Sequence, residues 1–411
     1  MKMNHYYALI AFVLIMASGC KKSLNSSVDL TAGAKAGFAS NAQWQMPTKT
    51  GRLIRYDIGD GHGSDCILSY DVGTGVVTLT QVIGTTSTTI SPASIGFNTN
   101  LGAIYVGTWN TDITDNFNEI GGVHIIPYDA NGTGHEDHIL LYIPGHGLAY
   151  VLHYVGGAIP WLVDWSNDSG NRTSGSGIGG YDLLGLTDKI IAYDYGTGYK
   201  NYLICYRPGY GKVWVMHNNS LTSWTPVVEG SGGIGGFDMS NVADQLVAVD
   251  LSPGIMDLVA YRPGYGFVWY LHHAAYSTNF TTGYSTRSGF PNFTFAYPQD
   301  RVIALNESGS TSSTANNTMY CYRPGYGIAY SVVDAVSGST WSGGAPLPGP
   351  GYSLYDDPYG APATYEGDHV LTFAGNTGYG NSSMLFYSNG GSYQSQINYF
   401  NPTTQSYYQV Y

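Results

Sequence analysis

Charge is scarce in this sequence, and basic charge is scarcer than acidic charge. Only 11% of the 411 residues are charged, and 16 Lys and Arg stand against 28 Asp and Glu, for a formal net charge of −12. Proteins that bind nucleic acids or anionic membrane surfaces use clustered Lys and Arg to neutralise phosphates. The basic residues here are scattered, so we expect no nucleic-acid partner.

Helical periodicity and familiar catalytic motifs are also lacking. No stretch beyond the N-terminal segment keeps an apolar repeat of the helical kind. There is no Gly-x-Ser-x-Gly elbow, zinc-binding helix or phosphate loop in a supporting context, and no carboxylate pair is singled out by its spacing. The sequence therefore assigns no catalytic residue.

Glycine and tyrosine are abundant, with 56 and 37 copies, and both gather in a repeated hexapeptide. Tyr-Arg-Pro-Gly-Tyr-Gly stands at Tyr206–Gly211, Tyr261–Gly266 and Tyr322–Gly327, and an altered form, Tyr-Ile-Pro-Gly-His-Gly, at Tyr142–Gly147. A hexapeptide repeated this faithfully indicates a repeat architecture.

Each copy of the repeat reads as short β-strands separated by Gly, Pro, Asn and Ser. In the third copy the predicted strands are Lys189–Tyr195, Tyr202–Tyr206, Lys212–His217 and Trp224–Glu229. Units of four strands that recur along a chain are typical of an all-β fold, the β-propeller. We count six copies over residues 44–411, or seven if Ile95–Asn116, with Trp109, is a degenerate copy.

The hexapeptide falls between the second and third strands, where Pro followed by Gly predicts a type II turn. That turn requires neither the Arg nor the second Tyr, so exposed side chains there are free to stack on sugar rings and to hydrogen-bond sugar hydroxyls. The alternative is that each Arg packs over an aromatic ring. The candidate ligand-binding residues of the turns are Arg207, Tyr210, Arg262, Tyr265, Arg323, Tyr326 and His146.

A second repeated element lies between copies, as Gly-Ile-Gly-Gly-Tyr-Asp at Gly177–Asp182 and Gly-Ile-Gly-Gly-Phe-Asp at Gly233–Asp238. One interpretation is structural, because the glycines allow a crossover and the Asp caps a turn. The other places this loop on the ligand-binding face. In that case its candidate binding residues are Tyr181, Asp182, Phe237 and Asp238.

One loop has the spacing of a calcium site. Oxygen-bearing side chains stand at loop positions 1, 3, 5 and 9, as Asp129, Asn131, Thr133 and Asp137. A tight turn of this kind can gather hard oxygen ligands around Ca²⁺. The alternative is an ordinary Asn-Gly hairpin turn.

Histidine and cysteine recur at repeat positions without a metal-binding spacing. His153, His217 and His272 each stand six residues after a hexapeptide, and copies one and five have Gln81 and Val333 instead, so we expect structural roles. Cys205 and Cys321 each precede a hexapeptide. We expect them, with Cys66, to be buried and unpaired.

The N-terminus reads as an export signal. Lys2 is followed by an apolar run, Tyr6–Met16, too short to span a membrane, and then by Ala-Ser-Gly-Cys ending at Cys20. This tetrapeptide resembles the lipobox of bacterial lipoproteins, and the run Cys-Lys-Lys-Ser that begins at Cys20 is similar to lipoproteins of the Bacteroidota. The resemblance implies a signal peptide at 1–19, lipidation of Cys20, a tether over 20–43 and attachment to the outer membrane.

The repeat itself resembles a bacterial and fungal Tyr-Arg-Pro-Gly repeat of exported, lectin-like propellers, and more broadly the FG-GAP and VCBS repeats, whose blades carry calcium loops. The resemblance is specific for the fold and not for an activity. With the turn residues, we predict a monomeric, lipid-anchored module that binds a glycan or another cell-surface ligand, with Ca²⁺ as its candidate cofactor. Two alternatives remain open. One is a polysaccharide lyase or glycoside hydrolase built on a propeller, and the other is a protein-binding adhesion module.

Overall fold

The structure is a computed structural model of the chain. It describes residues 51–57, 66–71, 76–83, 86–89, 95–96, 124–155, 161–168, 176–252, 255–304, 318–324, 328–334, 341–346, 368–373, 383–388, 396–401 and 406–409. Backbone contacts divide the chain into Met1–Ala42 and Gln43–Tyr411, and every described residue belongs to the second unit. The predicted signal peptide, Cys20 and tether lie outside the described residues. Within the described ranges no helix is long and apolar enough to cross a membrane.

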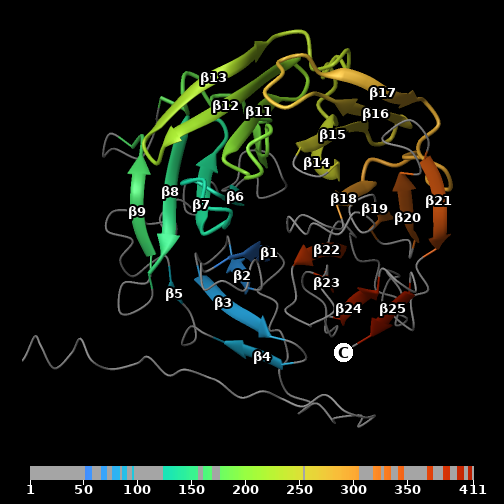
Figure 1. Ribbon diagram of the computed structural model, residues 1–411, viewed down its shortest axis with the longest axis horizontal. Coiled ribbons are helices and arrows are strands. Elements are labelled where there is room, and N and C mark those ends of the chain that lie inside the picture. Colours follow the sequence, from blue (N-terminus) through green and yellow to red (C-terminus); the bar gives the residue numbers. More distant parts are fainter. Residues whose placement is uncertain are drawn as a thin grey trace, which may run out of the picture. The chain divides into compact units, whose positions relative to one another are not determined.

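The described residues form β-strands in six sheets (Figure 1). The first three sheets contain β1 (Gly51–Tyr56), β2 (Cys66–Asp71), β3 (Val76–Ile83), β4 (Thr86–Thr89) and β5 (Ile95–Gly96); β6 (His124–Tyr128), β7 (His138–Ile143), β8 (Leu148–Tyr154) and β9 (Trp161–Ser166); and β10 (Lys189–Tyr193), β11 (Tyr202–Arg207), β12 (Lys212–Ser220) and β13 (Ser223–Gly230). The other three contain β14 (Gln245–Ser252), β15 (Ile255–Arg262), β16 (Phe267–His272) and β17 (Thr281–Thr286); β18 (Arg301–Ala304), β19 (Thr318–Arg323), β20 (Ile328–Asp334) and β21 (Trp341–Pro346); and β22 (Asp368–Phe373), β23 (Ser383–Ser388), β24 (Gln396–Asn401) and β25 (Ser406–Gln409).

Within each sheet the strands follow one another in chain order. Four consecutive strands pair antiparallel, and in the first sheet β5 pairs in addition with β3. This arrangement confirms the predicted all-β fold of four-stranded propeller blades. The predicted seventh copy falls mostly on residues outside the described ranges, so its existence stays a prediction.

Burial within a blade explains the residue pattern of its strands. In the second blade every residue of β7 is buried, because this strand is covered on both faces. In the third blade the outermost strand, β13, keeps alternating exposed positions. A continuous apolar run therefore marks the second strand of a blade, and an alternating pattern marks the fourth strand.

The hydrophobic core lies between neighbouring blades. One cluster joins residues of β6–β9 to residues of β10–β13, and another joins β10–β13 to β14–β17. The first strands also contact in series, β1 with β6, β6 with β10, β10 with β14, β14 with β18, β18 with β22, and β22 with β1. Among the described residues, apolar clusters thus fill the space between consecutive blades from the first to the fifth.

The cysteine prediction is confirmed. Cys66, Cys205 and Cys321 are buried and form no disulfide bond. Burial raises the pKa of the Cys205 and Cys321 thiols, so both are inert, neutral core residues.

Candidate ligand-binding face

The hexapeptide forms the hairpin turn between the second and third strands of its blade. In the three blades whose turn is described, the N–H of its fifth residue donates to the carbonyl three residues earlier at 3.2 Å, from His146, Tyr210 and Tyr265. The glycine at the third turn position has a positive φ in each, 83°, 88° and 84° at Gly145, Gly209 and Gly264. These features confirm the predicted type II turn.

Each turn also holds the loop that leads into the next blade. Both of its glycine N–H groups donate to a single carbonyl oxygen at 2.9 to 3.1 Å: Gly145 and Gly147 to Leu183, Gly209 and Gly211 to Met239, and Gly264 and Gly266 to Phe295. The three acceptor residues adopt left-handed backbone, with φ of 50°, 49° and 49°. The hairpin turns and the inter-blade loops therefore share one edge of the blades.

The inter-blade loop occurs three times among the described residues. An antiparallel bridge closes it at Ile178–Tyr181, Ile234–Phe237 and Phe290–Phe293. Sequence reasoning missed the third loop because Pro291 and Asn292 replace its glycine pair. Asn292 takes the left-handed conformation, φ 69°, that Asn tolerates better than most residues. The signal that identifies it is the spacing from Phe293 to Asp300, which matches Tyr181 to Asp188.

The hexapeptide arginines are held by carboxylates of the inter-blade loops. Arg207 donates from Nε and Nη2 to Asp188 at 2.7 Å, and Arg262 does the same to Asp244 at 2.6 and 2.9 Å. Arg323 repeats the pair with Asp300 at 2.6 and 3.0 Å. The three arginine side chains keep only 10 to 15% of their exposure, which favours the structural alternative for them over ligand binding.

Aromatic rings complete these ion pairs. The Arg262 guanidinium lies 5.5 Å from the Phe237 ring centre, and the Arg207 guanidinium lies 5.8 Å from that of Tyr181. The Tyr181 hydroxyl also donates to Asp188 at 2.7 Å. Tyr181 and Phe237 are buried, so the prediction that they bind a ligand is corrected to a core role. The packing alternative weighed for the arginines is the one that the structure favours.

The second tyrosine of the hexapeptide remains on the surface. Tyr210 is 71% exposed and Tyr265 is 57% exposed, while His146 is half-buried. A Cβ placed on Gly209, beside Tyr210, would lie 2.9 Å from the exposed Val242, and a Cβ on Gly264, beside Tyr265, would lie 3.6 Å from the exposed Pro298. An exposed apolar side chain therefore lies near each of these two turns. Tyr326 lies outside the described residues.

Two carboxylates stand at the same edge. Asp182 and Asp238 are exposed enough to meet solvent while each accepts a hydrogen bond from an arginine, Arg207 and Arg262 respectively. Burial by itself would raise the pKa of Asp238, but hydrogen bonds from Ser240 and Arg262 outweigh it and lower the pKa below the usual range. The pKa of Asp182 is lowered in the same way, by Leu184 N–H and Arg207 against burial. Both carboxylates stay ionised acceptors at neutral pH.

The predicted calcium loop is a turn capped by its own aspartate. Asp129 accepts from Thr133 N–H at 2.9 Å and from Gly134 N–H at 2.6 Å, and Thr133 Oγ1 donates to Asn131 at 3.0 Å. Asp194 caps the matching loop of the next blade through three backbone N–H groups, although that loop lacks the other acidic residues. The turn therefore forms without the ligand set, and Ca²⁺ at Asp129, Asn131, Thr133 and Asp137 stays a prediction.

The three repeated histidines make different contacts. His153 pairs with Asp164 and His272 with Asp257, both at 2.7 Å, and the His217 ring stacks on Tyr202 at 4.6 Å between ring centres. His153 also has a histidine beside it, His138 of the adjacent strand, with 5.3 Å between the ring centres. The sequence pattern did not single out His138.

Comparisons with known proteins bear on the fold only. No family model matches the sequence, and no curated protein matches it either. Among solved structures, a putative 6-phosphogluconolactonase from Bacteroides uniformis is 9% identical, with a TM-score of 0.40 over 88% of this chain and 81% of that one. A triple arginine mutant of AofleA from Arthrobotrys oligospora is 9% identical, with 0.45 over 89% and 87%, and Hsv2 from Kluyveromyces lactis is 6% identical, with 0.37 over 87% and 97%. Similarity at this level says nothing about a ligand.

Proposed function

We propose that this protein is an exported, lipid-anchored β-propeller that binds glycans at the edge formed by the hexapeptide turns and the inter-blade loops. The observation that carries the proposal is the exposure of Tyr210 and Tyr265. Every other residue of the hexapeptide has a structural role, since the first Tyr accepts a hydrogen bond from the next blade, the Arg holds a loop, and Pro and the glycines form the turn. Among the described contacts Tyr210 has no comparable role, and the Tyr265 ring meets only the Phe267 ring, at 6.5 Å between centres.

The chemistry around these rings suits a sugar. An exposed phenol ring beside an aliphatic side chain offers a flat apolar surface for the C–H face of a pyranose. Asp238 lies in the inter-blade loop that the Tyr210 turn holds, next to Met239. Its ionised carboxylate can accept hydrogen bonds from sugar hydroxyl groups. Because the unit recurs in neighbouring blades, weak contacts at single turns add up for a polymeric ligand.

The test is glycan-array binding of the double variant Tyr210→Ala, Tyr265→Ala. We expect binding to an array glycan to fall by about 100-fold, because the loss of two linked sites removes the multivalent gain. The matched control is Tyr276→Ala, which removes an equally exposed tyrosine between β16 and β17, at the opposite edge of its blade.

Two outcomes would overturn the proposal. One is unchanged glycan binding by the folded double variant, and the other is an equal loss in the Tyr276→Ala control. Release of reducing ends from bound polysaccharide would favour the enzymatic alternative, and binding to proteins with no array glycan bound would favour the adhesion module.

A further inference from the structure

A row of polar side chains crosses the second blade near the edge opposite the hexapeptide turn. Tyr128 of β6 pairs in register with His138 of β7, and His138 pairs with His153 of β8. His153 in turn faces Leu162 of β9, and Asp164 lies two residues further along that strand. Side chains of such a row stand on one face of a sheet, so these groups converge although they come from four strands.

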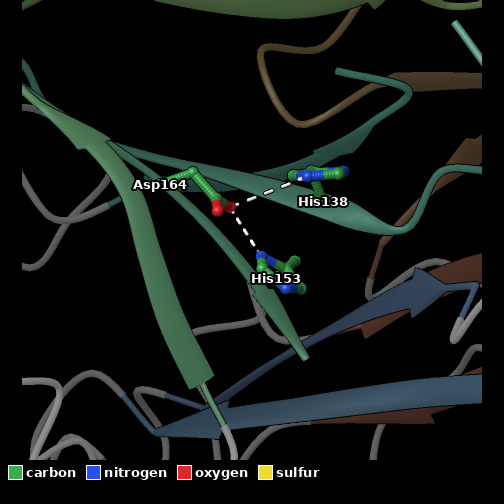
Figure 2. Close-up of side chains that lie close together, drawn as sticks. All are labelled: His138, His153 and Asp164. Atoms are coloured by element: carbon green, nitrogen blue, oxygen red, sulfur yellow. Dashed lines mark hydrogen bonds and ion pairs between the residues drawn. The ribbon is translucent and has the colours of Figure 1, made fainter. Parts of the chain in front are cut away.

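Three of these side chains point their ligating atoms at one spot. His153 Nδ1 lies 2.7 Å and His138 Nε2 lies 3.6 Å from the same oxygen of Asp164, and all three atoms lie within 4.8 Å of one another. Figure 2 shows the Asp164 carboxylate between the two imidazoles. Ligand atoms around tetrahedral Zn²⁺ are about 3.3 Å apart for bonds of about 2 Å. Small side-chain rotations therefore reach coordination distance.

His138 is already oriented as a metal ligand. Its Nδ1 lies 2.5 Å from the Asp137 carboxylate, which accepts the ring proton and leaves the Nε2 lone pair facing Asp164. A carboxylate on the far nitrogen is the usual partner of a zinc-binding histidine, since it fixes the tautomer and strengthens the ligand. The contact between Asp137 and His138 also holds the buried His138 ring in place.

A buried hydroxyl independently points to a missing ligand. The Tyr128 hydroxyl is fully buried and has no hydrogen-bond partner within the described ranges, and the Tyr128 ring meets the His138 ring edge-on at 6.5 Å between centres. A buried hydroxyl left without a partner destabilises the folded state, because its hydrogen bond to water is lost and not replaced. A cation with a bound water beside His138 and Asp164 would supply the partner.

The corresponding rows of the third and fourth blades lack this ligand set. In the third blade the row is Tyr193, Tyr202 and His217, without a carboxylate. In the fourth blade His272 pairs with Asp257 at 2.7 Å, but the ring nitrogens of the adjacent His273 contact the Tyr193 hydroxyl and the Ala274 carbonyl instead. The second blade therefore differs in ligand chemistry and not in fold.

We propose that His138, His153 and Asp164 bind a first-row divalent cation of the Zn²⁺ class, with a remaining position on the side of Tyr128. Two imidazoles and one carboxylate are the ligands that Zn²⁺ and its neighbours prefer, whereas Ca²⁺ takes oxygen ligands. On binding, the cation takes the place of the hydrogen shared by His153 and Asp164. The site is reachable, because the His153 and Asp164 side chains keep 30% and 15% of their exposure.

The test is calorimetric titration of the full chain, purified without a histidine tag and treated with EDTA, against Zn²⁺. We expect about one equivalent to bind, and we expect His153→Gln and Asp164→Asn each to weaken binding about tenfold or more. The matched control is His272→Gln, which breaks the same kind of His–Asp contact in the fourth blade and is expected to bind Zn²⁺ like the unaltered chain. Co²⁺ should show visible absorption bands that His153→Gln abolishes.

A second variant separates metal binding from folding. Tyr128→Phe removes a hydroxyl with no protein partner, so we expect the Tm of the metal-free chain to hold and Zn²⁺ affinity to fall. The proposal is overturned if no equivalent binds, if His153→Gln binds as tightly as the unaltered chain, or if His272→Gln is weakened equally. Unchanged affinity in Tyr128→Phe would overturn the part assigned to the hydroxyl.

Discussion

Arg207 and Arg262 each tie together the two ends of one inter-blade loop. Arg262 pairs with Asp238 near the start of its loop at 2.5 Å and with the buried Asp244 at its end. Asp244 is fully buried, and the Arg262 guanidinium is the cation that lies against it. A buried carboxylate that loses its cation is left with an uncompensated charge, which is far costlier than the loss of a surface ion pair.

We therefore predict that Arg262→Met lowers the free energy of unfolding by about 3 kcal/mol, because Asp244 stays buried without its partner. The control is Arg287→Met, since Arg287 is exposed and meets only the Phe267 ring at 5.3 Å. That change should cost about 1 kcal/mol or less. Urea denaturation of both variants checks the difference, and equal losses would contradict the structural role of Arg262.

His273 should make stability depend on pH below neutrality. The ring is buried among Tyr195 and Phe280, and this burial lowers its pKa from the usual value near 6.5. Below about pH 6.5 the unfolded chain takes up a proton that the folded protein resists. The stability that the neutral His273 contributes is therefore fully present above about pH 6.5 and decreases as the pH falls below that value.

The measurement is the Tm of the unaltered chain and of His273→Gln between about pH 5 and 7.5. We expect the difference between the two curves to shrink as the pH falls, because only the unaltered chain loses stability by protonating this site. The control is His272→Gln, whose ring is partly exposed. Parallel curves for His273→Gln and the unaltered chain would rule out the effect.

At the scale of the element, the hairpin turn and the inter-blade loop form one interlocked unit. The turn donates two N–H groups to a loop carbonyl, and the loop returns a third, from Gly177, Gly233 or Gly289 N–H to the carbonyl of the last turn glycine at 2.8 to 2.9 Å. The loop glycine sits against backbone. A Cβ on Gly233 would lie 1.8 Å from the carbonyl oxygen of Phe237.

Gly233→Ala should therefore be severely destabilising. The residue has φ of 86°, and the clashing atom belongs to the backbone, which cannot move aside without breaking the loop bridge. We expect a loss of more than about 3 kcal/mol, from backbone strain and steric overlap together. Gly232→Ala is the control, because a Cβ there meets nothing within 4 Å, and it should change stability by about 0.5 kcal/mol or less. Thermal denaturation distinguishes the two, and similar Tm values would show that the loop relaxes freely.

At the scale of the whole molecule, stability arises from repetition, and the proposed binding would depend on the same repetition. The blades bury their faces against one another. The contact in which two turn glycines donate to one loop carbonyl recurs at each described junction from β6 to β18. The same repetition lines up the exposed fifth side chains along one edge, where a polymeric ligand would meet several at once. The His138 site at the other edge is not repeated in the neighbouring blades whose rows are described.

The anchor predicted for the N-terminus is tested on the whole chain. Cys20→Ala should move the protein from the membrane fraction to the soluble fraction and abolish incorporation of labelled fatty acid, because the thiol of Cys20 is the predicted acceptor. Cys66→Ala is the control, since this cysteine is buried in the core. Continued lipid labelling of Cys20→Ala would contradict the lipoprotein interpretation.

The repeat, its four-stranded units and the turn type could be predicted from the sequence, because each depends on residues that are close together along the chain. Pro and Gly set the backbone angles of the turn within two positions, and β-branched and aromatic residues mark strands over five or six. The buried state of Cys205 and Cys321 followed from their place in such strands. The exposed Tyr210 and Tyr265 were also predicted, because the turn does not require them.

What the tertiary structure decided is the partner of each polar side chain. Arg207 looks equally suited to a ligand and to a carboxylate in the sequence, and only the fold brings Asp188 to within 2.7 Å of it. His138 and His153 stand fifteen residues apart without a metal-binding motif, and the register of β7 with β8 sets them side by side. Local order along the chain determines backbone geometry, because φ and ψ preferences act over a few residues. Ion pairs and ligand sets form between segments distant in sequence, so they depend on the register and packing that the whole chain reaches when it folds.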